Sequence, residues 1–348
     1  MGGDRAPAIV VQGASIAHRR MPQVRFALFG DEAQLAPLVQ ADPKLAAVAA
    51  IRHTDVAISA EEKPAQALRK GGQSSMRLAI DAVRDGAAAG MVSAGNTGAL
   101  MAIAKVVLRT QPGIDRPAMI QYFPTIRGES ALLDLGANVD CDANNLVQFA
   151  IMGAGFARSV LGVDRPTVGL LNVGAEELKG HETVREAGKI LREANNLDFT
   201  FRGFVEGDDI GAGTVDVFVT DGFTGNAVLK ATEGTAKLVV TFLRASFQRS
   251  WASRLGYLLA KPALDALRAK LDPRQYNGAM FLGLNGVVVK SHGGTDAEGF
   301  ASAISVAHDM VRGDFNERIH ADLELMAPAT AAAATPARPA AAQTAAST

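Results

Sequence analysis

The sequence predicts a three-layer α/β/α protein with a mainly parallel sheet and a projecting helical hairpin. Short apolar runs alternate with helical stretches along most of the 348 residues, which is the rhythm of βαβ units. Several of these runs end in turns rich in Gly, Asn, Thr and Asp, as buried parallel strands commonly do. The stretch over about 235–275 contains no strand-like run and predicts the hairpin.

The predicted elements follow the apolar periodicity in chain order. A strand over 24–30 precedes helices over 34–40 and 74–85. We expect residues 1–326 to form one catalytic domain. Residues 327–348 are almost wholly Ala, Thr and Pro, so we expect a disordered tail, because such a segment buries too little apolar surface to offset its ordering entropy. The other strands are expected over 91–93, 131–135, 167–173, 215–220 and 286–290.

Composition excludes several classes of protein. A formal net charge of −1 gives no argument for a nucleic-acid partner. The single cysteine, Cys141, excludes an intrachain disulfide and fits a reducing cytosol. No stretch approaches the roughly 20 apolar residues of a membrane span, and the N-terminus lacks the order of a signal peptide. We therefore expect a soluble cytoplasmic protein.

Two polar turns follow predicted strands and precede helical stretches. The first is SAGNTG at 93–98, and the second is DGFTGN at 221–226. A turn that opens a helix directs backbone N–H groups and the positive end of the helix dipole at one point, which suits an anion. Glycines let a ligand approach the backbone, and hydroxyl and amide groups add hydrogen bonds. The turns predict a site for a phosphate-like group. For the first turn, simple helix capping is the alternative.

These stretches and several others resemble the bacterial phosphate acyltransferase family of phospholipid synthesis. The resemblance runs from residue 1 to about 325, and nine ordered motifs along one chain make it specific. The motifs are MGGDRAP at 1–7, SSMRLAI at 74–80, SAGNTGALM at 93–101, LLDLGANVDC at 132–141, GLLNVG at 169–174, EELKG at 176–180, DGFTGN at 221–226, YNGAMFLGL at 276–284 and VVKSHG at 288–293.

The resemblance implies a fold, an activity and partners. The fold would be similar to the isocitrate dehydrogenase and phosphotransacetylase group, in a homodimer. The activity would transfer a fatty acyl group from acyl–acyl-carrier-protein to inorganic phosphate, without a cofactor. The implied partners are acyl carrier protein and a membrane-bound glycerol-phosphate acyltransferase that consumes the acyl phosphate.

The start of the chain departs from the family pattern. Family members carry a short strand ending in Asp-Ala before the MGGD motif, whereas here the motif opens the sequence. We expect that the start is assigned too late, because a missing core strand would leave backbone groups unpaired. A natural truncation that other contacts compensate is the alternative.

Three residues are expected to perform the chemistry. Phosphate must attack a thioester carbonyl, so the site must hold both the phosphate and the oxyanion that forms. Asp221 would accept a proton from phosphate or position it, although an Asx-turn that closes the strand explains it equally well. Asn226 would bind the oxyanion. Lys179 lies in a charged loop that by itself suggests only solvation, and the resemblance gives it the role of offsetting negative charge.

Further polar residues are expected to bind substrate. Ser93, Asn96 and Thr97 are the predicted phosphate contacts, through side chains and backbone N–H groups. His292 follows a strand of three valines and could act as an acid, a base or a hydrogen-bond donor, with a structural histidine as the alternative. The other residues expected to line the site are Asn138, Asn172, Thr224 and Lys290.

Other reactive groups are expected to be structural. Asp140 and Asp142 flank Cys141 and disfavour a thiolate, so we do not expect an acyl-enzyme at this cysteine. Asp208 and Asp209 are adjacent acids that we expect to lie on a loop and to be solvated. We expect no metal site, and no Walker A or strand-linked G-x-G-x-x-G motif supports a nucleotide cofactor.

Three rival functions remain open at this point. A phosphotransacetylase acting on a short acyl-CoA shares the physics but needs a nucleotide pocket. An NAD-dependent decarboxylating dehydrogenase needs a metal-binding acid cluster that the sequence does not offer. A non-enzymatic scaffold for membrane or carrier protein would use the hairpin alone.

The hairpin is expected to touch the inner face of the membrane reversibly. Trp251, Leu255, Leu258 and Leu259 fall on one helical face. Over 244–274, seven basic residues stand against two acidic ones, which favours anionic headgroups or the acidic carrier protein. The alternative is that the same leucines pack against the partner's helices in a homodimer.

Overall fold

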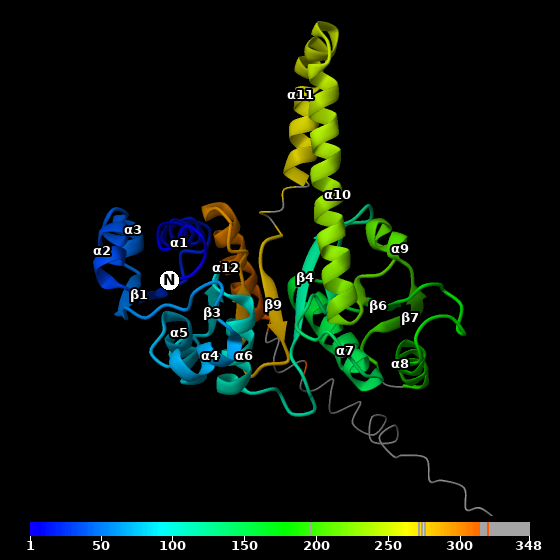
Figure 1. Cartoon of the computed structure of the whole chain (residues 1–348), viewed down its shortest axis with the longest axis horizontal. Coiled ribbons are helices and arrows are strands. Elements are labelled where there is room, and N and C mark those ends of the chain that lie inside the picture. The colour runs from blue at the N-terminus through cyan, green and yellow to red at the C-terminus, as the bar shows by residue number, and fades with distance from the viewer. Residues whose placement is uncertain (195–196, 271, 273, 275, 314–318, 320–348) are drawn as a thin grey trace, which may run out of the picture.

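One eight-stranded sheet forms the centre of the molecule, with helices on both faces (Figure 1). The structure, a computed structural model, describes residues 1–194, 197–270, 272, 274, 276–313 and 319. The strand order is β3-β10-β9-β4-β5-β8-β6-β7. In that order the strands span Gly90–Ser93, Val287–Lys290, Ala279–Leu282, Ala118–Pro124, Glu129–Leu133, Val217–Val219, Thr167–Leu171 and Thr200–Val205.

The strands of this sheet run in two opposite directions. Strands β3, β10 and β4 run one way, and β9, β5, β8, β6 and β7 run the other way. The sheet is parallel toward both ends and antiparallel in the middle. The predicted fold class is confirmed, but the sequence analysis did not find β4, β7 and β9 of this sheet, and short runs of this kind carry no signal of strand direction.

Different helices cover the two faces of the sheet. Buried side chains of α7, α8 and α12 pack on one face. On the other face, α4, α5 and α6 pack beside β3 and β10, while α9 and the first turns of α10 pack beside β5 and β8. These helices are α4 (Pro64–Lys70), α5 (Ser75–Arg84), α6 (Thr97–Leu108), α7 (Ala143–Val160), α8 (Glu182–Glu193), α9 (Gly207–Ala212), α10 (Gly222–Gln248) and α12 (Ala297–Arg312).

The central helix α7 forms the best-buried part of the core. Phe149 and Phe156 are fully buried between the sheet and the neighbouring helices α8 and α12. The helix begins with a capping box, in which Asp142 accepts from the backbone N–H of Asn145 at 2.8 Å and Asn145 accepts from that of Asp142 at 3.3 Å. This cap fixes where the loop after β5 ends and the helix begins.

The N-terminal part packs beside β3 as a smaller layer. It contains α1 (Ala8–Arg20), β1 (Phe26–Gly30), α2 (Glu32–Gln40), α3 (Pro43–Ala46) and β2 (Ala49–His53). Strands β1 and β2 form a separate parallel pair, and α1 packs against α12. The strand expected over 24–30 and the helix expected over 34–40 are therefore confirmed as β1 and α2.

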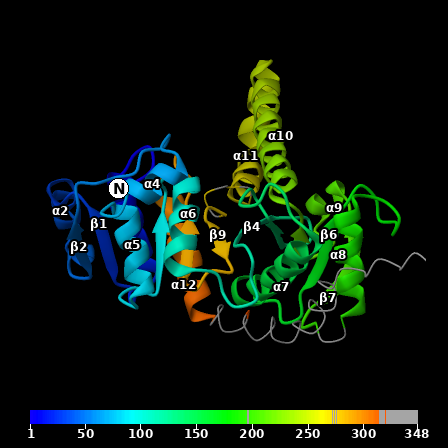
Figure 2. The same ribbon diagram turned by 60° about the horizontal axis from the view of Figure 1, so that its bottom comes forward.

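The predicted hairpin is present but begins earlier than expected. Helix α10 starts at Gly222, directly after the second polar turn, and α11 (Trp251–Lys270) returns beside it. Figures 1 and 2 both show the pair projecting away from the body. No helix in the described ranges is long and apolar enough to cross a bilayer. The tail expected to be disordered, residues 327–348, lies outside the described residues.

Candidate active site

The predicted site residues gather at two opposite edges of the eight-stranded sheet. Strands β3 and β10 end at one edge, which we call the Ser93 edge, and β5, β8 and β6 end at the other, which we call the Asp221 edge. The Ser93 edge holds Ser93, Asn96, Thr97, Lys290 and His292. The Asp221 edge holds Asn138, Asn172, Lys179, Asp221, Thr224 and Asn226.

At the Ser93 edge, the strand register places Lys290 beside Ser93. The two residues are register partners on parallel strands, so their side chains leave the same face of the sheet. Lys290 is only 9% exposed, and its Nζ donates to the carbonyl oxygen of Ser291. Burial lowers the pKa of Lys290 to about 8, and the carboxylate of Asp4 opposes this shift. A buried cation therefore lies where two parallel strands end.

The start of α6 leaves hydrogen-bond donors without acceptors at the same edge. Thr97 and Gly98 are the first two helical residues, and their N–H groups have no acceptor among the described residues. The side chains of Thr97 and His292 are exposed there. Gly2 packs against the backbone of Gly95, so the first residues of the chain lie against this turn.

Asn96 holds the structure of this turn with both ends of its side chain. Its Oδ1 accepts from the backbone N–H of Ala99 at 3.0 Å and caps α6. Its Nδ2 donates to the carbonyl oxygens of Ser59, Ala60 and Glu62 at 3.2, 2.9 and 2.9 Å. Because these contacts use the amide fully, the capping interpretation describes the Asn96 side chain better than direct phosphate contact does.

Residues that the sequence analysis missed hold the loop after Lys290. The Asn277 side chain donates to Ser291 Oγ at 2.8 Å and to Gly299 O at 2.8 Å, and it accepts from His292 N at 3.0 Å. Asn277 lies in the YNGAMFLGL motif, which supports the family resemblance but does not by itself predict a role for Asn277.

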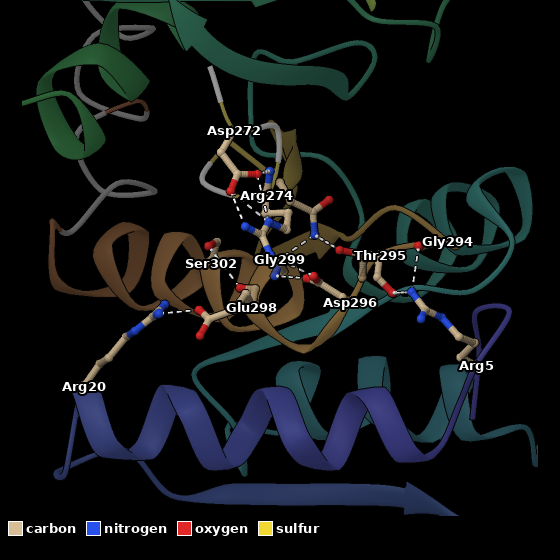
Figure 3. A network of polar contacts seen from close by, with 11 residues as sticks. Arg5, Arg20, Asp272, Arg274, Gly294, Thr295, Asp296, Glu298, Gly299 and Ser302 are labelled. Atoms are coloured by element: carbon tan, nitrogen blue, oxygen red, sulfur yellow. Dashed lines mark hydrogen bonds and ion pairs between the residues drawn. The ribbon is translucent and has the colours of Figure 1, made fainter. Parts of the chain in front are cut away.

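Two arginines secure the same loop from outside, as Figure 3 shows. Arg5 donates to Gly294 O at 3.3 Å and Thr295 O at 3.0 Å. Arg274 bridges Asp272 and Asp296, and Asp296 caps α12. The loop is thereby tied to the N-terminal segment and to the chain that leaves the hairpin.

At the Asp221 edge, Asp221 caps the start of α10. Its carboxylate accepts from Thr224 N at 2.9 Å and from Thr224 Oγ1 at 2.8 Å. Gly222 N donates to Asn138 O at 2.7 Å, and Gly225 N donates to Asp221 O at 2.9 Å. At the start of α10, unlike at the start of α6, most of the N–H groups therefore donate hydrogen bonds to acceptors within the protein.

A buried carboxylate that the sequence analysis missed supports this edge. Asp134 is fully buried and accepts from the backbone N–H groups of Met119 at 2.9 Å and Ala137 at 3.1 Å, as well as from both nitrogens of Asn138. Burial raises the pKa of Asp134, while these donors act in the opposite direction. Asn138 also donates to Pro117 O at 2.8 Å, so its side chain is structural. Asp134 and Asn138 both lie in the LLDLGANVDC motif, so the motif was the sequence feature that could have pointed to Asp134.

The remaining predicted residues of the Asp221 edge divide into structural and exposed groups. Asn172 donates to the carbonyl oxygens of Gly174 and Lys179 and shapes the loop between them. Lys179 is exposed and pairs with Glu176 at 2.8 Å, which raises the pKa of Lys179. The exposed Asn226 side chain lies close to Gly136 and has no hydrogen-bond partner in the described structure.

Cys141 and the adjacent acids Asp208 and Asp209 lie outside the two polar turns. Burial raises the pKa of Cys141 to about 12, which leaves little thiolate at neutral pH. Asp208 and Asp209 lie in the first turn of α9, where Asp209 takes part in a capping box, rather than on a loop. Within the described ranges, no cluster of three or more His, Cys, Asp or Glu side chains could hold a metal ion.

Solved structures with a similar fold include a phosphotransacetylase and a phosphotransacylase. A phosphotransacetylase from Streptococcus pyogenes matches with a TM-score of 0.60 at 18% identity, over 88% of this chain and 92% of that one. A branched-chain phosphotransacylase from Enterococcus faecalis matches with a TM-score of 0.54 at 14% identity, over 89% and 97%. The fold is therefore that of the phosphotransacetylase class.

Sequence similarity identifies the family within this class. Residues 1–318 match the family described as "Fatty acid synthesis protein". A phosphate acyltransferase from Rhodospirillum rubrum is 62% identical over 319 residues, which cover 92% of this chain and 91% of the relative. One from Rhodospirillum centenum is 61% identical over 334 residues, with 96% and 94% covered. The chain belongs to the phosphate acyltransferase family. It is an acyltransferase of lipid synthesis that makes acyl phosphate, as the motifs predict.

Proposed function

We propose that this chain transfers a fatty acyl group from acyl–acyl-carrier-protein to inorganic phosphate that is bound at the Ser93 edge. One observation carries the choice of edge: the unpaired N–H groups of Thr97 and Gly98 lie at the edge where the buried cation Lys290 lies beside Ser93. Oriented N–H groups, a helix dipole and a buried ammonium together suit a phosphate dianion. The α10 turn is less suited, because Asp221 already brings a negative charge to it.

The transfer needs no group that the chain lacks. An oxygen of phosphate forms a bond to the acyl carbonyl carbon, and the bond between that carbon and the carrier's sulfur breaks. The proton that phosphate loses passes to the departing thiolate, so the products are acyl phosphate and the free carrier thiol. Orientation and stabilisation of the oxyanion supply the acceleration.

The Asp221 edge lies at the opposite end of the strands from the Ser93 edge, so in this proposal its exposed polar groups reach the bound phosphate from the second copy of a homodimer and serve the acyl side of the reaction. Asp221 carries the proton from phosphate toward the thiolate. Asn226 has an amide with no partner in the described structure and donates to the oxyanion. Lys179 offsets the negative charge that accumulates, at the cost of its exposed pair with Glu176.

A direct assay tests this function. The protein is incubated with phosphate and palmitoyl–acyl-carrier-protein, palmitoyl-CoA or acetyl-CoA, and acyl phosphate is measured. We expect product from the carrier-protein substrate at the highest rate. Faster turnover of acetyl-CoA would instead support a phosphotransacetylase, and no product from any donor would support a scaffold.

We propose two roles for the hairpin: its stem forms a dimer interface and its tip contacts the membrane. Its stem carries exposed apolar side chains on α10, and we propose that these pack against a second copy in a homodimer. The stem residues are Leu238, Val239, Val240, Phe242 and Leu243. The tip carries exposed Trp251, Leu255, Leu258 and Leu259 among basic residues.

The tip contacts the cytoplasmic face of the membrane reversibly in this proposal. Long-chain acyl phosphate is poorly suited to diffusion through water, so release at the bilayer delivers it to a membrane-bound acyltransferase that acylates glycerol phosphate. The basic residues near the tip favour anionic headgroups and also suit the acidic carrier protein.

A further inference from the structure

A carboxylate without a hydrogen-bond donor lies at the Ser93 edge, beside the groups that hold phosphate in the proposed function. The side chain of Asp4 is exposed, and no donor in the described part of the chain bonds to it. Its negative charge attracts the ammonium group of Lys290 and opposes the lowering of the Lys290 pKa by burial, yet the two side chains form no direct ion pair. A ligand that binds beside Lys290 therefore also meets a free acceptor.

The backbone around Asp4 is fastened to the loop that follows β10. Asp4 N donates to Gly293 O at 3.0 Å, and the next residue, Arg5, donates to Gly294 O and Thr295 O (Figure 3). A Cβ added to Gly294 would lie 3.2 Å from Asp4 Oδ2, so the glycine lets the carboxylate come close to this loop. The loop thereby fixes where the carboxylate lies.

The residues before Asp4 pack against the turn that follows β3. A Cβ added to Gly2 would lie 3.0 Å from the Cα of Gly95, and one added to Gly3 would lie 2.9 Å from the Cβ of Ala94. Gly3 also has a φ of +98°, which disfavours any residue with a side chain. The segment 2–4 is therefore held between the loops that end β3 and β10, and it carries Asp4 to the place where these two strands end.

A carboxylate at an anion site distinguishes between oxyanions by their protons. Phosphate and arsenate keep at least one proton at neutral pH, whereas sulfate keeps none. An ionised carboxylate only accepts hydrogen bonds, and an O–H group that donates to it makes a short, strong bond. Sulfate oxygens would instead face the carboxylate as like charges with no hydrogen between them, which weakens binding.

We propose that Asp4 makes the phosphate site selective for oxyanions that carry a proton. The anionic oxygens of phosphate accept from the N–H groups of Thr97 and Gly98 and from Lys290, and its P–OH group donates to the Asp4 carboxylate. The hydrogen bond acts on binding, and the covalent bonds made and broken are those given above. This inference rests on the proposed function and adds the residue that discriminates against sulfate.

Competition between oxyanions tests the inference in wild type and in Asp4→Asn. Formation of acyl phosphate from the carrier-protein substrate is measured at varied phosphate concentration, with arsenate or sulfate as the competitor. In wild type we expect the inhibition constant of sulfate to exceed that of arsenate by about tenfold to hundredfold. Asparagine keeps the shape of aspartate but offers an N–H donor, so in Asp4→Asn we expect this ratio to fall by about tenfold or more. An unchanged ratio in a folded Asp4→Asn protein would overturn the inference.

Two further variants separate a direct contact from a general effect of charge. Glu61→Gln removes one negative charge from an exposed position beside Ala60, whose carbonyl oxygen accepts from the Asn96 that caps α6. It should leave the ratio of the two inhibition constants as in wild type, and an equal fall in this control would overturn the inference. Asp4→Glu keeps the carboxylate and should retain more of the discrimination than Asp4→Asn does.

Failure of the inference differs from failure of the proposed function. If Lys290→Gln raises the KM for phosphate while Asp4→Asn leaves the ratio unchanged, the phosphate site stands and the role of Asp4 is wrong. If Lys290→Gln leaves the KM for phosphate unchanged, the proposed site is wrong and the inference falls with it. Wild type alone also decides: sulfate that inhibits as strongly as arsenate would overturn the inference, whatever the variants do.

Discussion

Lys290 and Ser93 are register partners at the carboxyl ends of β10 and β3, and Lys290 is buried where the unpaired N–H groups of α6 begin. Burial of an ammonium group is unfavourable unless something compensates its charge. Within the described structure, the Lys290 Nζ has a carbonyl acceptor on Ser291 and an attractive interaction with Asp4. A bound phosphate would complete this compensation.

Lys290→Gln should raise the KM for phosphate more than it changes the KM for the acyl donor. Loss of one charge-assisted contact corresponds to roughly a tenfold to hundredfold change. Initial rates at varied phosphate concentration measure the effect. Lys105→Gln is the matched control, because Lys105 is an exposed lysine on α6 away from its N-terminal turn. An unchanged KM for phosphate in Lys290→Gln would place the phosphate elsewhere.

The KM for phosphate should depend on pH because of the same lysine. The pKa of Lys290 is about 8, so the side chain is cationic below that pH and becomes neutral as the pH rises through it. We therefore expect the KM for phosphate to rise above about pH 8. Lys290→Arg keeps its charge over this range and should remove the rise. Identical pH profiles for wild type and Lys290→Arg would show that Lys290 does not titrate in the free enzyme.

Asn96→Ala should destabilise the protein as well as slow it. The substitution removes the cap of α6 and the donors to the carbonyls of Ser59, Ala60 and Glu62. We expect the free energy of unfolding to fall by about 2 kcal/mol, measured by urea denaturation. Asn144→Ala is the control, because Asn144 makes one exposed hydrogen bond to Asp115. Lost turnover with unchanged stability would restore the direct contact with phosphate.

Cys141→Ser should retain turnover within about twofold of wild type. The raised pKa of Cys141 disfavours a thiolate, and the transfer to phosphate needs no acyl-enzyme. The measurement is the steady-state rate with the carrier-protein substrate, beside Asp221→Ala, which we expect to lose about a hundredfold. A folded but inactive Cys141→Ser protein would revive a covalent intermediate.

The double variant Leu258→Glu with Leu259→Glu should lose binding to anionic vesicles and keep its activity in solution. Both leucines are exposed near the tip of the hairpin, where added carboxylates oppose burial and repel anionic lipid. Co-sedimentation with phosphatidylglycerol vesicles measures binding. Ala263→Glu with Ala266→Glu adds the same charge farther from the tip and should bind better. Dissociation of the double variant to monomers, or a wild type that ignores the vesicles, would show that these leucines serve another purpose.

The sequence by itself determined the features that depend on neighbouring residues. The fold class, the polar turns at 93–98 and 221–226, and the strands that precede them all follow from local periodicity and turn chemistry. The motifs likewise identified the family, because they are specific as ordered strings. The sequence leaves an Asx-turn and a proton-transfer role open for Asp221, and the structure shows its carboxylate capping α10. Whether Asp221 also moves a proton stays a prediction.

Only the tertiary structure decided where these local features lie relative to one another. The two turns look alike in sequence, yet Ser93 and Asp221 lie at opposite edges, because β9 and β4 enter the sheet antiparallel between them. Segments far apart in the chain bury Lys290 and Asp134. Such segments also supply the acceptors for the side-chain amides of Asn96 and Asn138. Strand order and direction arise from long-range pairing and packing, which leave no mark in the pattern of any single strand.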